Sequence, residues 1–221
     1  DIKNIAQEKA GIIKDKTPVL LGPDIKETLP IFERKSKEKE APLYQTKDSI
    51  IQQPSLPSYL LHNWKTALEA STILYKSFPV SIEANPKKYL TIRGRWQVVQ
   101  NKPKIVLDVG HNEQGIHAIL NQLDNESYDH LHIMLGFSAE KETERILLLF
   151  PKDATYYITK STNERSADPN IIQTHIRAKK VNCYHDFKEA FHSINKTVKK
   201  DDFVLICGSV FLVGDVLQEF F

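Results

Sequence analysis

One stretch points to the fold, "KIVLDVGHNEQGIHAIL" at residues 104–120. It begins with an apolar run typical of a buried strand, and it ends with apolar side chains spaced three and four residues apart, as on one face of a helix. Asp108, His111 and Asn112 lie where the first pattern changes into the second. A strand that leads directly into a helix is the repeating step of α/β proteins, so this stretch predicts a sheet covered by helices.

The same step recurs through the second half of the chain. Apolar runs at 104–109, 131–136, 154–159 and 203–207 alternate with helical patterns at about 113–123, 139–149, 186–196 and 209–220. This alternation predicts βαβ units around a mostly parallel sheet, as in a Rossmann-like α/β fold. The segment "RWQVVQNKPKIVLDV" (95–109) predicts two strands joined by a short polar turn, and we expect these two to be antiparallel.

The first part of the chain has a different pattern. We expect a long amphipathic helix from residue 58 to about 76, followed by the irregular segment "SFPVSIEANPKK" (77–88). That segment predicts a boundary between two domains, residues 1–82 and 83–221. Upstream we expect a helix in "DIKNIAQEKAGIIK" (1–14), a strand in "TPVLLG" (17–22), a charged helix ending in "ERKSKEKE" (33–40) and a strand in "APLYQTKDSII" (41–51).

Composition excludes several classes of protein. The 221 residues are 41% hydrophobic and 26% charged, and the net charge of +2 does not indicate a binder of nucleic acid or of anionic membranes. No apolar run approaches the roughly 20 residues of a membrane-spanning helix, and the N-terminus has no signal-peptide pattern. Cys183 and Cys207 lie in predicted strands and lack the spacing of a metal site, so we expect reduced, buried thiols and a cytoplasmic protein.

The junction at residues 108–112 suggests a ligand site. In an open α/β sheet, ligands bind beyond the carboxyl ends of the strands, near the helices that follow. Asp108 could accept hydrogen bonds from a ribose, Gly110 could let a ligand approach the backbone, and His111 could contact a base or a phosphate. The alternative is that these residues only cap the helix. "GHNEQG" lacks the GxGxxG spacing, which disfavours a nicotinamide cofactor.

Three further residues are candidates for function. On a helical wheel Lys9 falls on the predicted inward stripe, where a lysine must be paired, reach water, or lose its charge. A neutral amine there could capture carbon dioxide and bind a metal as a carbamate. Asn63 lies beside small side chains and could contact a flat ligand, or it could bond to the backbone. Arg95 follows Gly94 and could bind phosphate oxygens, or it could simply be solvated.

Five blocks, in this order and spacing, carry a resemblance to a known family. They are "IAQEKAGIIK" (5–14), "LLHNWKTAL" (60–68), "GRWQVV" (94–99), "LDVGHNEQG" (107–115) and "CGSVFLVGDVL" (207–217). Together they resemble the folylpolyglutamate synthase/dihydrofolate synthase family of the Mur ligase superfamily. The resemblance implies the tail of a central P-loop ATPase domain, followed by a Mur-type C-terminal domain with a Rossmann-like sheet.

The same resemblance implies a function. Family members use ATP and Mg²⁺ to phosphorylate a folate or dihydropteroate carboxylate, which the amine of L-glutamate then attacks. By position, Lys9 resembles the carbamylated lysine that holds magnesium, and His111 resembles a histidine beside that site. Asn63, Arg95 and Asp108 resemble the contacts to the base, the phosphates and the ribose of ATP. Arg165, in "STNERSADP" (161–169), and Ser209 resemble residues near the glutamate.

Departures from the family pattern shape what we expect of this chain. Ile92-Arg93 replaces the usual Trp-Pro before the Gly-Arg pair, and no glycine precedes a Lys-Ser or Lys-Thr pair, so the chain has no P-loop. We therefore expect the C-terminal portion of a longer enzyme, a monomer that folds but does not catalyse. Two alternatives are a non-catalytic nucleotide-binding module and a Mur-type ligase that acts on a cell-wall precursor.

Overall fold

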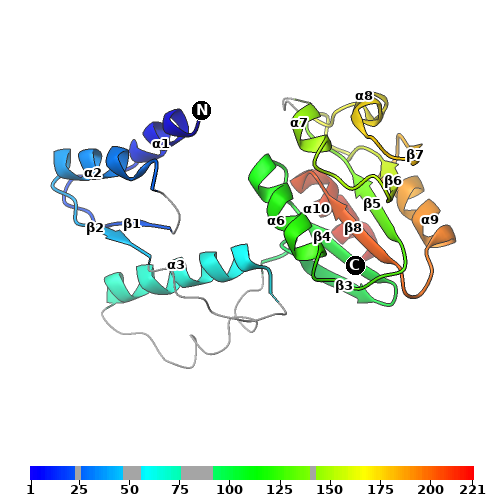
Figure 1. Ribbon diagram of the computed structural model, residues 1–221, viewed down its shortest axis with the longest axis horizontal. Helices are drawn as coiled ribbons and strands as arrows, with labels where there is room; N and C mark the ends of the chain where they lie inside the picture. Colours follow the sequence, from blue (N-terminus) through cyan, green and yellow to red (C-terminus); the bar gives the residue numbers. More distant parts are fainter. Residues whose placement is uncertain (23–25, 47–55, 76–91, 140–142) are drawn as a thin grey trace. The chain divides into compact units, whose positions relative to one another are not determined.

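The computed structural model describes residues 1–22, 26–46, 56–75, 92–139 and 143–221. The chain divides into two compact units, unit 1 from Asp1 to Thr91 and unit 2 from Ile92 to Phe221 (Figure 1). The predicted domain boundary after residue 82 lies outside the described residues. Within the described segments, no helix is both long enough and apolar enough to cross a membrane.

Unit 1 contains three helices and a two-stranded parallel sheet among its described residues. They are α1 (Ile2–Ala10), β1 (Val19–Leu21), α2 (Leu29–Glu38), β2 (Leu43–Gln45) and α3 (Ser58–Tyr75). The Asp1 side chain caps α1 by accepting hydrogen bonds from the N–H groups of Lys3 and Asn4, and Gly11 ends the helix. The predicted helices and strands of this part are confirmed where they are described.

The burial of α1 differs from the prediction. Ala6, Ala10 and Ile13 form its buried side, whereas Ile5 is 55% exposed. The buried stripe therefore runs i, i+4, i+7 through the small alanines, which allow α1 to pack against α2. Lys9 is exposed, so the prediction that it lies on the inward stripe of this helix is wrong.

Unit 2 is built on a six-stranded sheet with the strand order β3-β4-β8-β5-β6-β7. Strand β3 pairs antiparallel with β4, and all the other pairs are parallel, as predicted. The strands are β3 (Gln97–Asn101), β4 (Lys104–Asp108), β5 (Leu131–Leu135), β6 (Thr155–Ile158), β7 (Lys180–Cys183) and β8 (Phe203–Cys207). Every residue of β5, β6 and β8 is buried, which explains why these strands are continuous apolar runs in the sequence.

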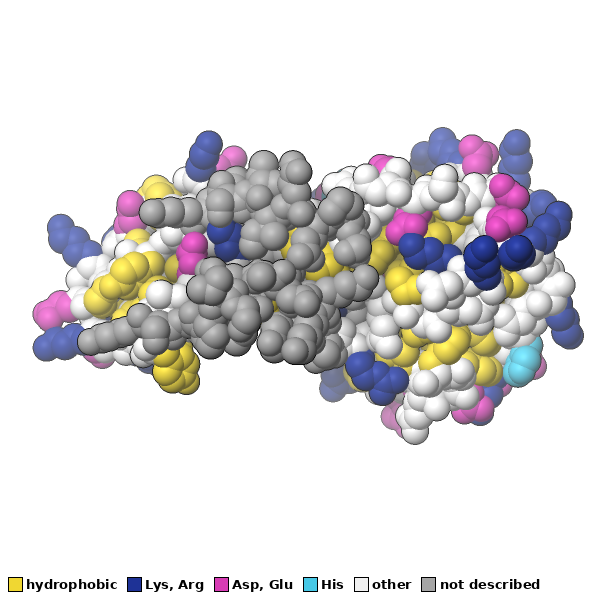
Figure 2. Space-filling model, turned by 90° about the horizontal axis from the view of Figure 1, so that it is seen from below, with side chains coloured by type: hydrophobic (Ala, Val, Ile, Leu, Met, Phe, Trp, Pro, Cys, Tyr) yellow, Lys and Arg dark blue, Asp and Glu magenta, His cyan; other side chains and the backbone are white. Residues whose placement is uncertain are grey.

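Helices cover both faces of this sheet (Figure 1). Helices α9 (Phe187–Thr197) and α10 (Val210–Phe220) pack on one face in a cluster that includes Leu107, Met134 and Ile206. Helices α6 (Glu113–Leu123), α7 (Glu144–Leu147) and α8 (Pro169–His175) lie on the other. On the face drawn in Figure 2, Lys and Arg side chains of unit 2 lie among acidic ones, so no field of a single sign covers that face.

In unit 2 the strand predicted around Cys183 is confirmed as β7, one helix (α8) was not predicted, and another helix is shorter than predicted. Strand β7 lies at the edge of the sheet with alternating exposed and half-buried residues, so it lacks the apolar run that marks its neighbours. Helix α8 has only seven residues, begins at Pro169 and is capped by Asp168. The helix expected at 139–149 is described only at Glu144–Leu147, since 140–142 are outside the described residues.

Candidate functional site at the carboxyl edge of the sheet

Three glycines follow the carboxyl ends of the central strands. Gly110 lies beyond β4, Gly208 beyond β8 and Gly136 beyond β5. The N–H of Gly208 donates to the carbonyl of Gly110 (3.1 Å), and a Cβ on Gly208 would lie 2.7 Å from the carbonyl oxygen of Gly136. The backbone segments at this edge are therefore closer together than side chains permit. A role for Gly136 was not predicted, although each of these three glycines lies one or two residues after a buried strand.

Asp108 ends β4 and is buried, with a relative exposure of 1%. Its Oδ2 accepts a hydrogen bond from the N–H of Trp96 (2.8 Å), and its Oδ1 accepts one from the N–H of Gly110 (2.8 Å). The carboxylate thus ties the turn before β3 to the loop after β4. The predicted contact of Asp108 with a ribose stays a prediction. That Asp108 connects these two backbone segments was not predicted.

The turn that Asp108 anchors carries Arg95. Gly94 and Trp96 have positive φ angles of 71° and 43°, and the Gly94 carbonyl accepts a hydrogen bond from the N–H of Val109 (2.8 Å). A positive φ is uncommon for a tryptophan, and it persists because Asp108 and the burial of the indole hold the turn. Arg95 Nη1 lies 3.9 Å from Asp108 Oδ1, and the arginine side chain is 40% exposed. The turn presents a cation at the carboxyl edge of the sheet.

The loop after Asp108 packs closely on helix α6. A Cβ on Gly110 would lie 2.4 Å from Cδ1 of Ile119 in α6, so glycine lets the loop pack on the helix without moving that side chain, and the expected approach of a ligand is not needed to explain it. His111 Nδ1 lies 2.9 Å from the carbonyl oxygen of Val109. Because a carbonyl only accepts, Nδ1 carries a proton. Asn112 caps α6 by accepting from the N–H of Gly115 (2.8 Å), which confirms the capping alternative for this residue.

Arg165 and Ser209 lie farther along the same edge. Ser209 is 6% exposed and caps α10, its Oγ accepting a hydrogen bond from the N–H of Phe211 (3.2 Å). Arg165 is exposed and lines a cavity of about 480 Å³, with Thr162, Asn163, Glu164, Phe211 and Asp215. The Asp215 carboxylate accepts from the N–H of Thr162 (2.7 Å) and so fixes this loop to α10. Asp215 was not predicted, and its position midway along an apolar helix was the available signal.

The buried thiol beside this site is not a nucleophile. Cys207 ends β8 opposite Asp108, and it is fully buried. Burial, followed by the charge of Asp108, raises the pKa of Cys207 well above its ordinary value. Both cysteines are free thiols, as expected, but only Cys207 is buried, because Cys183 lies on the edge strand β7 and is half-buried.

The predicted residues of unit 1 are at the surface of that unit. Lys9 and Asn63 are exposed, on α1 and α3 respectively. Among the described residues, no group of three or more His, Cys, Asp and Glu side chains could hold a metal ion. The structure therefore brings Arg95, Asp108 and His111 together at one edge of the sheet in unit 2, whereas Lys9 and Asn63 belong to unit 1.

Comparison with known proteins decides the family. Residues 94–210, more than half of the chain, match the family described as "Mur ligase, glutamate ligase domain". The chain belongs to this family. The match begins at Gly94 and ends at Val210, so the glutamate ligase domain includes the Arg95 turn, Asp108 and the cap of α10.

Relatives of this Mur ligase chain are named dihydrofolate synthase/folylpolyglutamate synthase. It is 24% identical over 241 residues to the dihydrofolate synthase/folylpolyglutamate synthase of Buchnera aphidicola subsp. Schizaphis graminum (strain Sg), covering 97% of this chain and 56% of that protein. E. coli FolC in complex with DHPP and ADP has a TM-score of 0.86 at 20% identity, over 99% of this chain and 56% of that one. A bifunctional folylpolyglutamate synthase/dihydrofolate synthase with Mn, AMPPNP and L-glutamate bound has a TM-score of 0.79 at 22% identity, over 99% and 57%. The chain spans a little over half the length of these relatives, and the structural likeness establishes the fold.

Proposed function

We propose that this chain is the C-terminal part of an ATP-dependent ligase that joins L-glutamate to a folate or dihydropteroate carboxylate. Residues 83–221 would form the glutamate ligase domain, and residues 1–82 would be the tail of a central ATPase domain. The proposal draws support from the family, from the names of the relatives and from the cation held at the carboxyl edge of the sheet. We further propose that the protein acts in the cytoplasm as a monomer.

The observation that carries the proposal is the anchored turn at residues 94–96. Arg95 is held beside Asp108 while its guanidinium remains partly exposed, at the same edge as the first turn of α6. A guanidinium and the N–H groups of a helix N-terminus both stabilise phosphate oxygens. These groups fit the phosphates of ATP, which would supply the phosphoryl group that converts the carboxylate oxygen into a leaving group.

Each predicted residue of unit 2 then has a role at this edge. Arg95 would neutralise charge on the phosphates, and Asp108 would position Arg95 as well as contact the ribose. His111, whose Nδ1–H is held by a carbonyl, would lie next to the ligand. Arg165 would bind a glutamate carboxylate, and Ser209 would position the N-terminus of α10. Asn63 would contact the base.

The magnesium site is not complete in the described residues. Lys9 is exposed and no carboxylate or histidine cluster accompanies it, so these residues alone do not fit a magnesium ion. We expect Lys9 to be unmodified in the isolated chain. An added mass of one carbon dioxide located at Lys9 by native mass spectrometry would contradict this.

The test is phosphate release by the protein that contains this chain in its natural reading frame. We expect release to require both glutamate and either dihydropteroate or a reduced folate, and Arg95→Ala to lower it by about 100-fold, as for removal of one transition-state donor. Arg93→Ala, at an exposed arginine two residues away, is the matched control and should retain activity. Nucleotide binding without pterin-dependent release would instead support a nucleotide-binding module, and release that needs a cell-wall precursor would support the other Mur-type reaction.

A further inference from the structure

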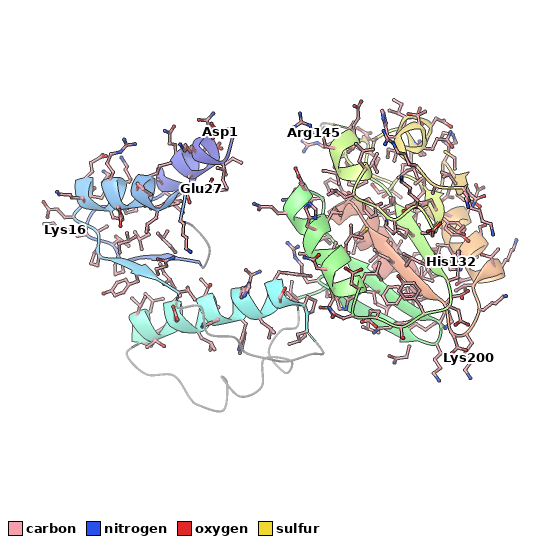
Figure 3. The ribbon with its side chains drawn as sticks, in the orientation of Figure 1. Asp1, Lys16, Glu27, His132, Arg145 and Lys200 are labelled. Atoms are coloured by element: carbon pink, nitrogen blue, oxygen red, sulfur yellow. The ribbon has the colours of Figure 1, made fainter. Side chains whose placement is uncertain are left out.

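A second polar cavity opens at the opposite edge of the unit 2 sheet, where the parallel strands begin. Its volume is about 540 Å³, within the range of roughly 300–1,000 Å³ for small-molecule sites. Figure 3 labels His132, which comes from the start of β5, and Lys200, which precedes β8, on this side of unit 2. The cavity is lined by Asp129, His130, His132, Thr155, Tyr157, Lys180, Asn182, Ser193, Thr197, Lys199 and Asp202.

The cavity interrupts an otherwise apolar interface between the sheet and α9. Tyr157 and Met134, paired across β5 and β6, belong to the core cluster that α9 covers. Two residues earlier in these strands, His132 pairs with Thr155, and Thr155 also pairs with Lys180. The same face of the sheet is therefore polar at this end. A well-packed apolar core at this end would be at least as stable as a buried polar one. The change from apolar to polar therefore favours a binding function over a purely structural one.

The buried polar groups form a connected and oriented wall. His132, which is 4% exposed, places Nε2 at 3.2 Å from Asp202 Oδ2 and Nδ1 at 3.1 Å from the hydroxyl of Tyr157. That hydroxyl lies 2.8 Å from Thr197 Oγ1 on α9. His130 packs edge-on against His132 and lies 2.8 Å from Thr155 Oγ1. Such bonds hold both rings in place before any ligand binds.

The charges of the lining favour an anion. Asp202 Oδ2 accepts from the N–H of Lys199 (2.7 Å) and from His132, so its negative charge is compensated within the protein. Burial lowers the pKa of His132, so its ring is neutral at pH 7. The exposed side chains of Lys180 and Lys199 then face only one other acid of the lining, Asp129. A ligand that also carries a hydroxyl or a protonated oxygen could donate to that carboxylate.

We propose that this cavity is a second ligand site, which binds a small oxyanion, a phosphate or carboxylate group, between Lys180 and Lys199 with His130 and Thr155 behind it. The inference does not depend on the proposed ligase activity, because the cavity lies at the edge of the sheet opposite to Arg95. Lysine ammonium groups bind such anions as point charges, and the wall behind them supplies oriented hydrogen-bonding groups.

The test is a titration of the 221-residue chain with sodium phosphate, and separately with sodium succinate, at pH 7.5 and constant ionic strength. The Cε1–H NMR signals of His130 and His132 should shift and saturate. Lys180→Gln combined with Lys199→Gln should weaken the apparent affinity at least tenfold. Lys14→Gln combined with Lys37→Gln removes the same charge from exposed positions in unit 1 and should leave the affinity unchanged.

The two ligands distinguish the sources of the anion. Saturation by phosphate alone would identify a phosphate-bearing ligand, and saturation by succinate alone a carboxylate. Both of the substituted lysines are exposed, so circular dichroism should show that the variants fold like the parent chain. Shifts that grow linearly without saturation, or that are equal in the Lys180/Lys199 variant and the parent, would overturn the proposal.

Discussion

Replacing Gly208 with alanine tests the close packing of the backbone at the carboxyl edge of the sheet. Gly208 has φ +104°, a conformation that other residues rarely adopt, and this strain costs about 1–3 kcal/mol. The new Cβ would lie 2.7 Å from the Gly136 carbonyl oxygen and 3.1 Å from the ring of Phe137. Overpacking of this kind costs another 1–3 kcal/mol or so. We therefore expect Gly208→Ala to lower the free energy of unfolding of unit 2 by about 2–6 kcal/mol.

The assay is urea unfolding followed by tryptophan fluorescence. The chain has two tryptophans, so a Trp64→Phe background leaves Trp96, which is buried in unit 2, as the reporter. Gly214→Ala is the matched control, because nothing lies within 4 Å of its added Cβ in α10, and alanine there should stabilise by about 0.5–1 kcal/mol. A loss below about 1 kcal/mol for Gly208→Ala would refute the argument that strain and contact with the Gly136 carbonyl constrain this position.

Three other predictions concern buried ionisable groups. Burial lowers the pKa of His132 below its ordinary value, so the unfolded chain binds a proton that the folded chain does not, and stability should fall as pH drops below about 6.5. His132→Gln should flatten that slope in thermal unfolding at pH 5–7. Asp108→Asn should lower the free energy of unfolding by about 1–3 kcal/mol, because the amide cannot accept from both backbone N–H groups, and the effect should appear in urea unfolding of unit 2. A thiol reagent should label Cys183 in the folded chain but not Cys207, and Cys183→Ser should abolish labelling until denaturant is added, as mass spectrometry would show.

The sheet of unit 2 was predictable because its strands are fully buried. Burial on both faces produces uninterrupted apolar runs, and these runs located β4, β5, β6 and β8 correctly. Strand β7, predicted around Cys183, is not among these apolar runs because an edge strand exposes alternate side chains and contributes little apolar signal. The order of the strands could not be predicted either, since no pattern in β8 states that it pairs with β4 and β5.

The sequence predicted which residues of unit 2 form the candidate site, but not the contacts that these residues make. The motifs predicted Arg95, Asp108 and His111, and the structure places them together, but no motif indicated that Asp108 also accepts hydrogen bonds from two backbone N–H groups. The predicted position of Lys9, on the inward stripe of α1, was wrong for a physical reason. Helix α1 packs through alanines and exposes larger apolar residues such as Ile5. Because isoleucine is more hydrophobic than alanine, the hydrophobic periodicity predicts the wrong buried face for this helix.

The order of the strands has a consequence for synthesis. Strand β8 follows every other strand of its sheet in the sequence, yet it lies between β4 and β5, so Phe203 pairs with Lys104 and with Leu131. Until β8 has left the ribosome, β3–β4 and β5–β6–β7 are separate parts of the sheet. Each part then has an unpaired edge where β8 will later bind. We expect these edges to be the part of the growing polypeptide that a chaperone must shield, and a premature stop before Phe203 to leave an aggregation-prone product.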